Sequence, residues 1–389
     1  MVKMSGLGEP YGGSLVDLVL PRERAEGRLK EASELTKVSP FVDFAYDAEK
    51  IAVGAYSPLQ GFMDSEEFRS VTKENRLPNG LPWTMPIVLA VPRETAKGFR
   101  EGDAISLLDW GGKIFATVDV GEVYPLPKSE FAQAAYGTTD PEHPNVGDIM
   151  NSYGDTAVAG KVALLRRLEL PTVTSEMTPR ETRELFRSKG WRNVVAYQCR
   201  NPPHTAHEYI QKVSLESDDI DGLFVQPVIG RLKKGDYKPD VIMEAYRRAV
   251  SGYYPKERVV LSSLSITMRY AGPKAALFLA IVRKNYGATH YIVGRDQAGV
   301  GKYYDPYACH RIFDQFDVGI TPMRYQEAFY CKTCKAMATS KTCPHPDVEH
   351  VSVSQTKMRQ LLQEGKELPT EILRPEVIEV LKRGDVVIV

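Results

Sequence analysis

The chain has 389 residues, and its 50 basic and 50 acidic side chains give a formal net charge of zero at pH 7. Apolar residues make up 43% of the chain, so intrinsic disorder, which needs low hydrophobicity together with high net charge, is excluded. The neutral charge also argues against broad nucleic-acid binding, which requires a clustered basic face, and the length predicts two or three domains.

The first stretch, residues 1–170, predicts a β-rich domain with many loops. Short apolar runs occur at residues 86–91, 104–108 and 113–118. Glycine, proline and aspartate separate these runs, as is typical of turns between strands.

From Thr178 onward, strands and helices alternate. The segment Thr178-Pro-Arg-Glu181 has the composition of a helix start, and Gly190 is suited to end that helix after Lys189. The following elements are predicted as strand 193–197, a helix from Pro203, strand 222–228, helix 239–250, strand 259–263, helix 273–285 and strand 289–293. This alternation predicts βαβ units and a parallel sheet over residues 171–325.

Residues 326–389 are expected to form a small C-terminal domain. This part contains a cysteine cluster and two predicted helices, near residues 356–364 and 375–382.

The sequence favours a soluble cytoplasmic protein with no membrane partner. The longest strongly apolar run, Ala275–Val282, is far shorter than the roughly 20 residues that cross a bilayer. The N-terminus has no apolar signal-peptide region. The five cysteines are odd in number and partly clustered, unlike a secreted disulfide framework.

Two loops follow strand ends, where parallel sheets bind ligands. The first reads Gln198-Cys-Arg-Asn-Pro-Pro-His-Thr-Ala-His207. His204 and His207 share one helix face, and a helix N-terminus offers free N–H groups to an anion. With Arg200, Gln198 and Asn201 beside them, these histidines predict a phosphate or sulfate receptor. Two structural histidines beside a surface arginine are the alternative.

The second loop reads Gly294-Arg-Asp-Gln-Ala-Gly-Val-Gly301. Its glycines allow close approach of the backbone to a ligand, and Arg295 offers a planar fork to phosphate. The chain has no Gly-x-x-x-x-Gly-Lys-Ser/Thr motif, which excludes a fused kinase domain of the Walker type.

The cysteine cluster predicts a metal site. Cys331 and Cys334 have Cys-x-x-Cys spacing, and Cys343 and His345 follow. Three thiolates and one imidazole fit a closed, tetrahedral, structural zinc site. His350 is the alternative fourth ligand, and ordinary reduced cysteines or a redox Cys-x-x-Cys pair are the alternatives to zinc.

Three further segments have a functional and a structural interpretation. Met268-Arg-Tyr-Ala-Gly-Pro273 precedes a helix and could line a nucleotide pocket or simply begin that helix. Gly230–Asp236 could bring Lys233 near an anion or form a solvated basic loop. Tyr56–Met63 is a Pro/Gly turn that is structural when taken alone.

Taken together, these segments resemble the sulfate adenylyltransferase (ATP sulfurylase) family, in the form without a fused adenosine phosphosulfate kinase domain. The resemblance covers essentially the whole chain and also includes Val353-Ser-x-Thr-Lys357 and Arg359. It implies a PUA-like β domain over residues 1–170, a Rossmann-like nucleotidyltransferase domain over 171–325 and a small zinc-containing α/β domain over 326–389.

The resemblance implies the reaction ATP + sulfate ⇌ adenosine 5′-phosphosulfate + pyrophosphate, with Mg²⁺ accompanying ATP, and a homodimer or larger homo-oligomer. The reaction can also run toward ATP. Expected catalytic residues are Arg200, Asn201, His204 and His207. Expected sulfate ligands are Gln198, Arg200 and the Ala298 N–H. Expected ATP contacts are Asn201, His204, His207, Met268, Gly294, Arg295, Asp296 and Gln297.

Two positions differ from the family pattern. Gln297 stands where the family usually has histidine, and Cys199 stands where it usually has threonine. Glutamine donates a hydrogen bond but carries no charge, and a thiol is a weaker donor than a hydroxyl.

Two other functions fit parts of the pattern. An adenylyltransferase acting on an organic phosphate would use the same His-x-x-His loop. A non-catalytic RNA-binding protein would use a PUA-like domain and a zinc cluster, but it would need a basic stripe with stacking aromatic residues, which the sequence lacks.

Overall fold

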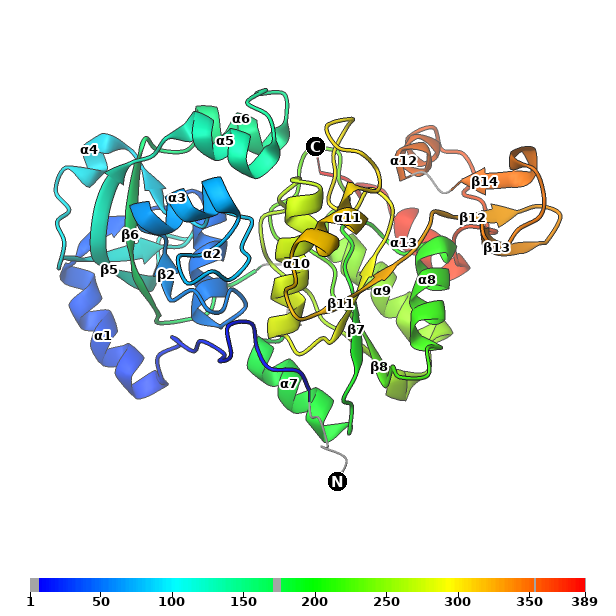
Figure 1. The fold of residues 1–389 in the computed structure, drawn as a ribbon, viewed down its shortest axis with the longest axis horizontal. Helices are drawn as coiled ribbons and strands as arrows, with labels where there is room; N and C mark the ends of the chain where they lie inside the picture. The colour runs from blue at the N-terminus through cyan, green and yellow to red at the C-terminus, as the bar shows by residue number, and fades with distance from the viewer. Residues whose placement is uncertain (1–6, 171–175, 353–354, 389) are drawn as a thin grey trace.

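The computed structural model describes residues 7–170, 176–352 and 355–388. They form two lobes, and the last part of the chain packs on the second lobe (Figure 1). Within these ranges, no helix has both the length and the apolar character needed to cross a membrane.

The first lobe is built on a six-stranded sheet with the order β1-β4-β5-β6-β2, in which β3 also pairs with β6. Its strands are β1 (Thr36–Val38), β2 (Gly61–Phe62), β3 (Ala90–Val91), β4 (Ala104–Leu108), β5 (Ile114–Pro125) and β6 (Thr156–Leu164). The long strands β4, β5 and β6 are antiparallel. Of the run 86–91, only the last two residues form a strand.

The first lobe also contains helices, which the prediction of a mostly β segment with loops did not include. They are α1 (Arg22–Glu34), α2 (Val42–Ala52), α3 (Ser65–Glu74), α4 (Arg93–Ala96), α5 (Lys128–Tyr136) and α6 (Pro144–Asn151). In α1 only Ala25 and Ala32 are buried, so the helix has no apolar stripe to reveal it. In α3 a capping box between Asp64 and Glu67 was a readable signal.

The second lobe contains the predicted parallel sheet, with the order β11-β10-β7-β8-β9 and every pair parallel. Its strands are β7 (Val194–Tyr197), β8 (Gly222–Val225), β9 (Val259–Leu261), β10 (His290–Val293) and β11 (Thr321–Arg324). Its helices are α7 (Pro179–Ser188), α8 (Thr205–Leu215), α9 (Pro239–Tyr253), the 3₁₀ turn η1 (Lys256–Arg258), α10 (Pro273–Asn285) and α11 (Ala308–Gln315).

The local signals explain where several of these elements begin and end. The Thr178 side chain accepts from the Glu181 N–H to complete the predicted capping box, and Gly190 ends the segment with a φ of 72°. Strand β8 ends three residues earlier than predicted. Pro227 has no N–H to donate to the sheet, and pairing continues only as an isolated bridge between Val228 and Leu264.

The order of the parallel sheet reverses between β7 and β10. The chain runs from β7 through β8 to β9 on one side, then returns to place β10 and β11 on the other. The loops that follow β7 and β10 therefore leave neighbouring strands at the same edge, and ligands of open α/β sheets bind at this switch point.

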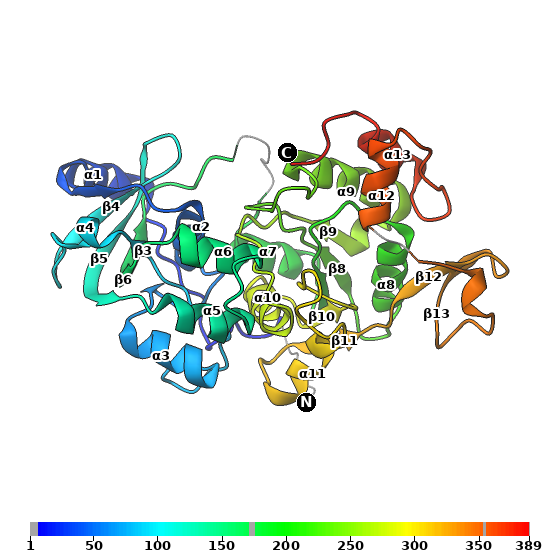
Figure 2. The same ribbon diagram turned by 90° about the horizontal axis from the view of Figure 1, so that it is seen from above.

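Helix α10 lies at the boundary between the lobes (Figures 1 and 2). Its Phe278 ring contacts Tyr56 and Trp83 of the first lobe, with ring centroids 5.1 and 5.5 Å apart. One apolar cluster of buried residues continues through both lobes. Arg231 adds a polar link, with Nη1 lying 3.1 Å from Asp43 and 2.8 Å from Asp148.

The last part of the chain adds a three-stranded antiparallel sheet and two helices. The sheet has the order β13-β12-β14, and its strands are β12 (Ala328–Cys331), β13 (Ala336–Thr339) and β14 (His350–Ser352), with the 3₁₀ turn η2 (Asp347–Glu349) before β14. The helices are α12 (Gln355–Gln363) and α13 (Pro375–Leu381), close to the predicted ranges. Val353 and Ser354 of the family-like segment lie outside the described residues.

Gly222 offers a test of the packing under the parallel sheet. A Cβ at Gly222 would lie 2.5 Å from the Trp191 ring, and overpacking of this kind costs about 1–3 kcal/mol. We expect Gly222→Ala to lower the free energy of unfolding by about that amount in urea denaturation.

Gly252 in α9 is the matched control, because a Cβ there meets no atom within 4 Å. Gly252→Ala should leave stability equal or raise it by about 0.5–1 kcal/mol. Equal effects of the two substitutions would contradict the described packing of Trp191.

Candidate functional site

A cavity of about 370 Å³ lies at the switch point between β7 and β10. Ten of the eleven predicted substrate-site residues line it: Gln198, Arg200, Asn201, His204, His207, Gly294, Arg295, Asp296, Gln297 and Ala298. The two loops are about 100 residues apart in the sequence, and the parallel pairing of β7 with β10 brings them together.

Two stacked imidazoles form the wall at the start of α8. The His204 and His207 ring centroids lie 3.5 Å apart with an interplanar angle of 23°. His204 caps the helix, because its Nδ1 accepts from the His207 N–H at 3.2 Å. This acceptor role leaves the proton of a neutral His204 on Nε2, which makes that atom a donor.

Burial keeps both imidazoles neutral near pH 7. Burial lowers the pKa of His204 well below its ordinary value, and the neighbouring His207 lowers it further. Burial alone lowers the pKa of His207 to about 3. At neutral pH the two rings therefore act as hydrogen-bonding groups rather than as cations.

Several polar atoms of this wall make no hydrogen bond within the described structure. Within the described ranges, Gln198 Oε1, Arg200 Nε and His207 Nδ1 are buried without a hydrogen bond. Unpaired buried polar atoms are costly and need an explanation. Their convergence on one cavity indicates a polar ligand that pairs with them.

The loop after β10 depends on left-handed backbone and internal hydrogen bonds. Asp296 and Ala298 have φ values of 50° and 58°. A Cβ at Gly299 would lie 2.1 Å from the Asp296 carboxylate, so any larger residue there would displace that side chain. Burial raises the pKa of Asp296, partly offset by Arg295 and Arg200.

Both departures from the family pattern have structural roles in their loops. The Gln297 side chain accepts from the Gly294 N–H at 3.2 Å and donates to the Tyr291 hydroxyl at 2.5 Å. The Cys199 thiol donates to the Asn201 carbonyl, and the Asn201 N–H donates to the sulfur, both at 3.2 Å. Each side chain thus stabilises its own loop through local hydrogen bonds.

Arg295 lies at the rim of the cavity. Its side chain is 44% exposed, and its Nε lies 3.4 Å from the Glu327 carboxylate. This arginine can move toward an incoming anion at little cost, because an exposed ion pair contributes only about 0–1 kcal/mol.

The structure does not bring Met268 to the cavity wall. Met268 is 1% exposed, and its carbonyl accepts from Asn145 of the first lobe at 3.2 Å. Two residues later, Tyr270 lies beneath the guanidinium of Arg200, with its ring centroid 4.9 Å from Cζ. The segment therefore supports the site through Tyr270.

Three charged or polar residues of the wall were missed as site residues: Gln326, Glu327 and Arg359. Gln326 and Glu327 follow the end of β11, so the strand-end rule could have found them. Arg359 comes from α12, and no local pattern connects it with a loop almost 160 residues earlier. Only its place in the family-like segment after Val353 drew attention to it.

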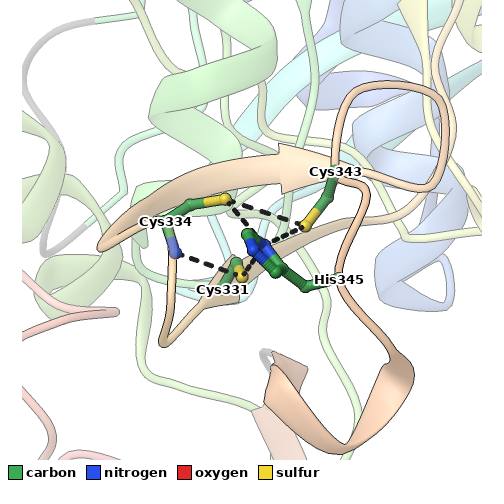
Figure 3. Close-up of side chains that lie close together, drawn as sticks. All are labelled: Cys331, Cys334, Cys343 and His345. Atoms are coloured by element: carbon green, nitrogen blue, oxygen red, sulfur yellow. Dashed lines mark hydrogen bonds between the residues drawn. The ribbon is translucent and has the colours of Figure 1, made fainter.

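The cysteine cluster converges as predicted (Figure 3). Cys331, Cys334, Cys343 and His345 offer ligand atoms that all lie within 4.8 Å of one another. His345 Nδ1 lies 3.5, 3.2 and 3.6 Å from the sulfurs of Cys331, Cys334 and Cys343. A tetrahedral zinc site needs ligand separations of about 3.5–3.8 Å, so this set could hold such a metal.

His350 lies outside this group of four. Its ring stacks on Phe329 with centroids 3.7 Å apart, and its Nδ1 lies 3.3 Å from the Asp347 carboxylate. The geometry therefore favours His345 over His350 as the fourth ligand.

Comparison with known proteins agrees with both lobes. The family model described as a PUA-like domain matches residues 8–167. A solved structure described as a hexameric APS kinase from Thiobacillus denitrificans aligns with 97% of this chain and 68% of its own, with a TM-score of 0.76 and 24% identity. That likeness concerns the fold. The chain is thus a PUA-like domain joined to an α/β nucleotidyltransferase-like core.

The family model described as ATP-sulfurylase matches residues 174–384. Sulfate adenylyltransferases of Thermococcus onnurineus and Pyrococcus abyssi are each 46% identical over 377 and 380 residues, covering 97% of this chain and 98% of theirs. That of Chloroflexus aurantiacus is 45% identical over 382 residues, covering 97% of both chains. The chain belongs to the ATP-sulfurylase family.

The buried His207 predicts a pH dependence of stability. Its pKa is about 3 in the folded protein, against about 6.5 in an unfolded chain. Because the unfolded state binds the proton more readily, the free energy of unfolding should fall as the pH drops below 6.5. The slope from this group approaches about 1.4 kcal/mol per pH unit.

Urea denaturation of the unmodified protein and of His207→Gln, each at pH 7, 6, 5 and 4, measures this contribution. Carboxylate titration is common to both proteins and cancels in the difference. The unmodified protein should lose stability relative to the variant as the pH falls. A difference that stays constant over this range would contradict the assignment of a low pKa to His207.

Proposed function

We propose that this protein is a sulfate adenylyltransferase that converts ATP and sulfate into adenosine 5′-phosphosulfate and pyrophosphate. The observation that carries the proposal is that Gln198, Arg200 and His207 line one cavity, and that each has a buried polar atom without a hydrogen bond in the described structure. Membership of the ATP-sulfurylase family and similarity to sulfate adenylyltransferases over nearly the whole chain support it.

The proposed reaction is a direct in-line displacement. A sulfate oxygen forms the new bond to the α-phosphorus, and the bond from that phosphorus to the bridging oxygen breaks, so pyrophosphate leaves with the electron pair. Sulfate is already an anion at neutral pH, so the step needs no general base. The contribution of the protein is to position the reactants and to stabilise developing negative charge.

The cavity supplies groups suited to these tasks. Arg200, Gln198 and the Ala298 N–H are assigned to sulfate. His204, His207 and Asn201 are assigned to the ATP phosphates, and Gly294, Arg295, Asp296 and Gln297 to the nucleotide end. The neutral Nε2–H of His204 donates to a phosphoryl oxygen without requiring protonation of the ring.

Mg²⁺ is proposed to enter with ATP as part of the substrate, where it would offset phosphate charge without dedicated protein ligands. Zinc is proposed to bind Cys331, Cys334, Cys343 and His345. Four protein ligands would leave no open position, so this metal would stabilise the C-terminal sheet rather than take part in the reaction.

The remaining expectations form part of the same proposal. They are a division into domains at residues 1–170, 171–325 and 326–389, a Rossmann-like central domain, a homodimer or larger homo-oligomer, a cytoplasmic location and a reaction that can also run toward ATP. No nucleic acid is proposed as a partner, and the family match favours sulfate over the organic phosphate of the alternative adenylyltransferase.

Release of pyrophosphate from MgATP, with and without sulfate, tests the function. The assay should include pyrophosphatase and a step that removes adenosine phosphosulfate, because removal of both products drives the reaction forward. We expect release to depend on sulfate, and Arg200→Ala to raise the sulfate KM and lower kcat by about 10²–10³, the usual cost of losing one oxyanion donor.

Arg311→Ala is the control, since Arg311 is 59% exposed and pairs only with Asp305 in the described structure. It should retain normal activity. If folded protein releases pyrophosphate at a rate that does not depend on sulfate, the proposed acceptor is contradicted. Organic phosphates would then be screened as acceptors. Near-normal activity of Arg200→Ala at low sulfate would contradict the role of Arg200.

Metal analysis of gently purified protein should find about one zinc per chain, as a closed tetrahedral site requires. His345→Ala should lose most of this zinc and lower the melting temperature, whereas His350→Ala should retain it. Protein without bound zinc, or loss of zinc only in His350→Ala, would contradict the proposed ligand set.

A further inference from the structure

A single buried carboxylate holds together three cations from three different segments. Asp236 is 1% exposed and lies in the loop between β8 and α9. Its oxygens lie 3.8 Å from Arg200 Nε, 3.3 Å from Arg359 Nη1 and 3.5 Å from Lys233 Nζ. Arg200 and Arg359 both line the cavity.

The two arginines are oriented by more than charge. The Arg200 guanidinium lies over the Tyr270 ring, whose centroid is 4.9 Å from Cζ, and its Nε faces Asp236 at 3.8 Å. The Tyr270 hydroxyl itself donates to Asp236 at 2.8 Å. Arg359 Nη1 also donates to the Gly235 carbonyl at 2.7 Å. Each arginine thus has a second contact besides its ion pair with Asp236.

The backbone at Asp236 is also fixed, by residues near the end of the chain. The Gly235 N–H donates to the Ile388 carbonyl, and the Ile388 N–H donates to the Asp236 carbonyl, both at 2.8 Å. An isolated bridge joins Tyr237 with Val387. The carboxylate is therefore carried by a paired segment rather than by a free loop.

We propose that Asp236 is a positioning residue that holds Arg200 and Arg359 as a pair aimed at the anionic groups of the substrates. This inference rests on the proposed function, because it assigns both arginines to the same anion-binding wall. It adds Arg359, from α12, as a second cation that contacts sulfate or the phosphoryl oxygens.

The balance of charge distinguishes positioning from simple neutralisation. Within this cluster, one carboxylate among three cations leaves an excess of two positive charges. Asp236 therefore aligns the arginines without cancelling their attraction for anions. Removing its charge should leave anion binding intact while the arginines lose their alignment, and a misplacement of about 1 Å can cost about 10²-fold in rate.

Asp236→Asn tests this inference, because asparagine keeps the volume and can still accept from Tyr270. We expect kcat to fall by about 10²-fold, with the sulfate KM and the Kd for pyrophosphate within about threefold of those of the unmodified protein. Asp385→Asn is the matched control, since this carboxylate pairs with Lys238 in the same region but its side chain is 76% exposed. It should change nothing.

Three results would overturn the inference. A normal kcat with tighter pyrophosphate binding would mean that Asp236 only neutralises charge. Proportional losses of kcat, affinity and melting temperature would mean a structural role. Additive losses in the double variant Asp236→Asn with Arg359→Lys would mean that the two residues act independently, because a shared role makes their effects non-additive.

If the Asp236→Asn variant does not fold, the Arg359→Lys variant alone tests the inference. Lysine retains the charge but not the planar fork, so kcat should fall about tenfold with an unchanged melting temperature, and a normal kcat would overturn the inference. Pyrophosphate binding is measured without acceptor. Suppose that the protein binds pyrophosphate and the substitutions have the expected effects, but the reaction does not depend on sulfate. That result would contradict sulfate as the acceptor, while the proposed pairing of the two arginines would stand.

Discussion

The parallel pairing of β7 with β10 is the constraint on which the site depends. Their register places His290 opposite Val195 and Tyr291 opposite Ala196. The loops that follow the two strands therefore leave the sheet at the same edge. The cavity, the start of α8 and the position of the loop after β10 all follow from that pairing. A sheet that connected β7 and β10 in another order would separate the residues that the ligand needs together.

Much of this arrangement could be predicted because its causes are local. The capping residues around Thr178, the alternation of strands with helices and the Cys-x-x-Cys spacing are each visible in a short window. The strand-end rule then places the loops at Gln198 and Gly294 side by side without any knowledge of long-range contacts. The stacking of His204 on His207 likewise has a local cause, because it joins the N-cap residue of α8 to the first turn of that helix.

Other features depend on contacts that no short window contains. Arg359 lies in the site because α12 packs against a loop more than 100 residues earlier in the sequence. The role proposed for Asp236 depends on the three cations around it. Met268 lies away from the cavity for a related reason. Its backbone joins Asn145 of the first lobe, whereas Tyr270, two residues on, contacts Arg200. The polar helix α1 was missed because it buries almost nothing.

The apolar cluster that spans both lobes has a consequence for cooperativity. Phe278 packs its ring on Tyr56 and Trp83 across the boundary, so separating the lobes would expose the interior of each. Unfolding of one lobe therefore removes apolar packing partners from the other, which couples the stabilities of the two sheets. A ligand bound only in the second lobe will then protect the first from proteolysis, because it stabilises the folded state that both share.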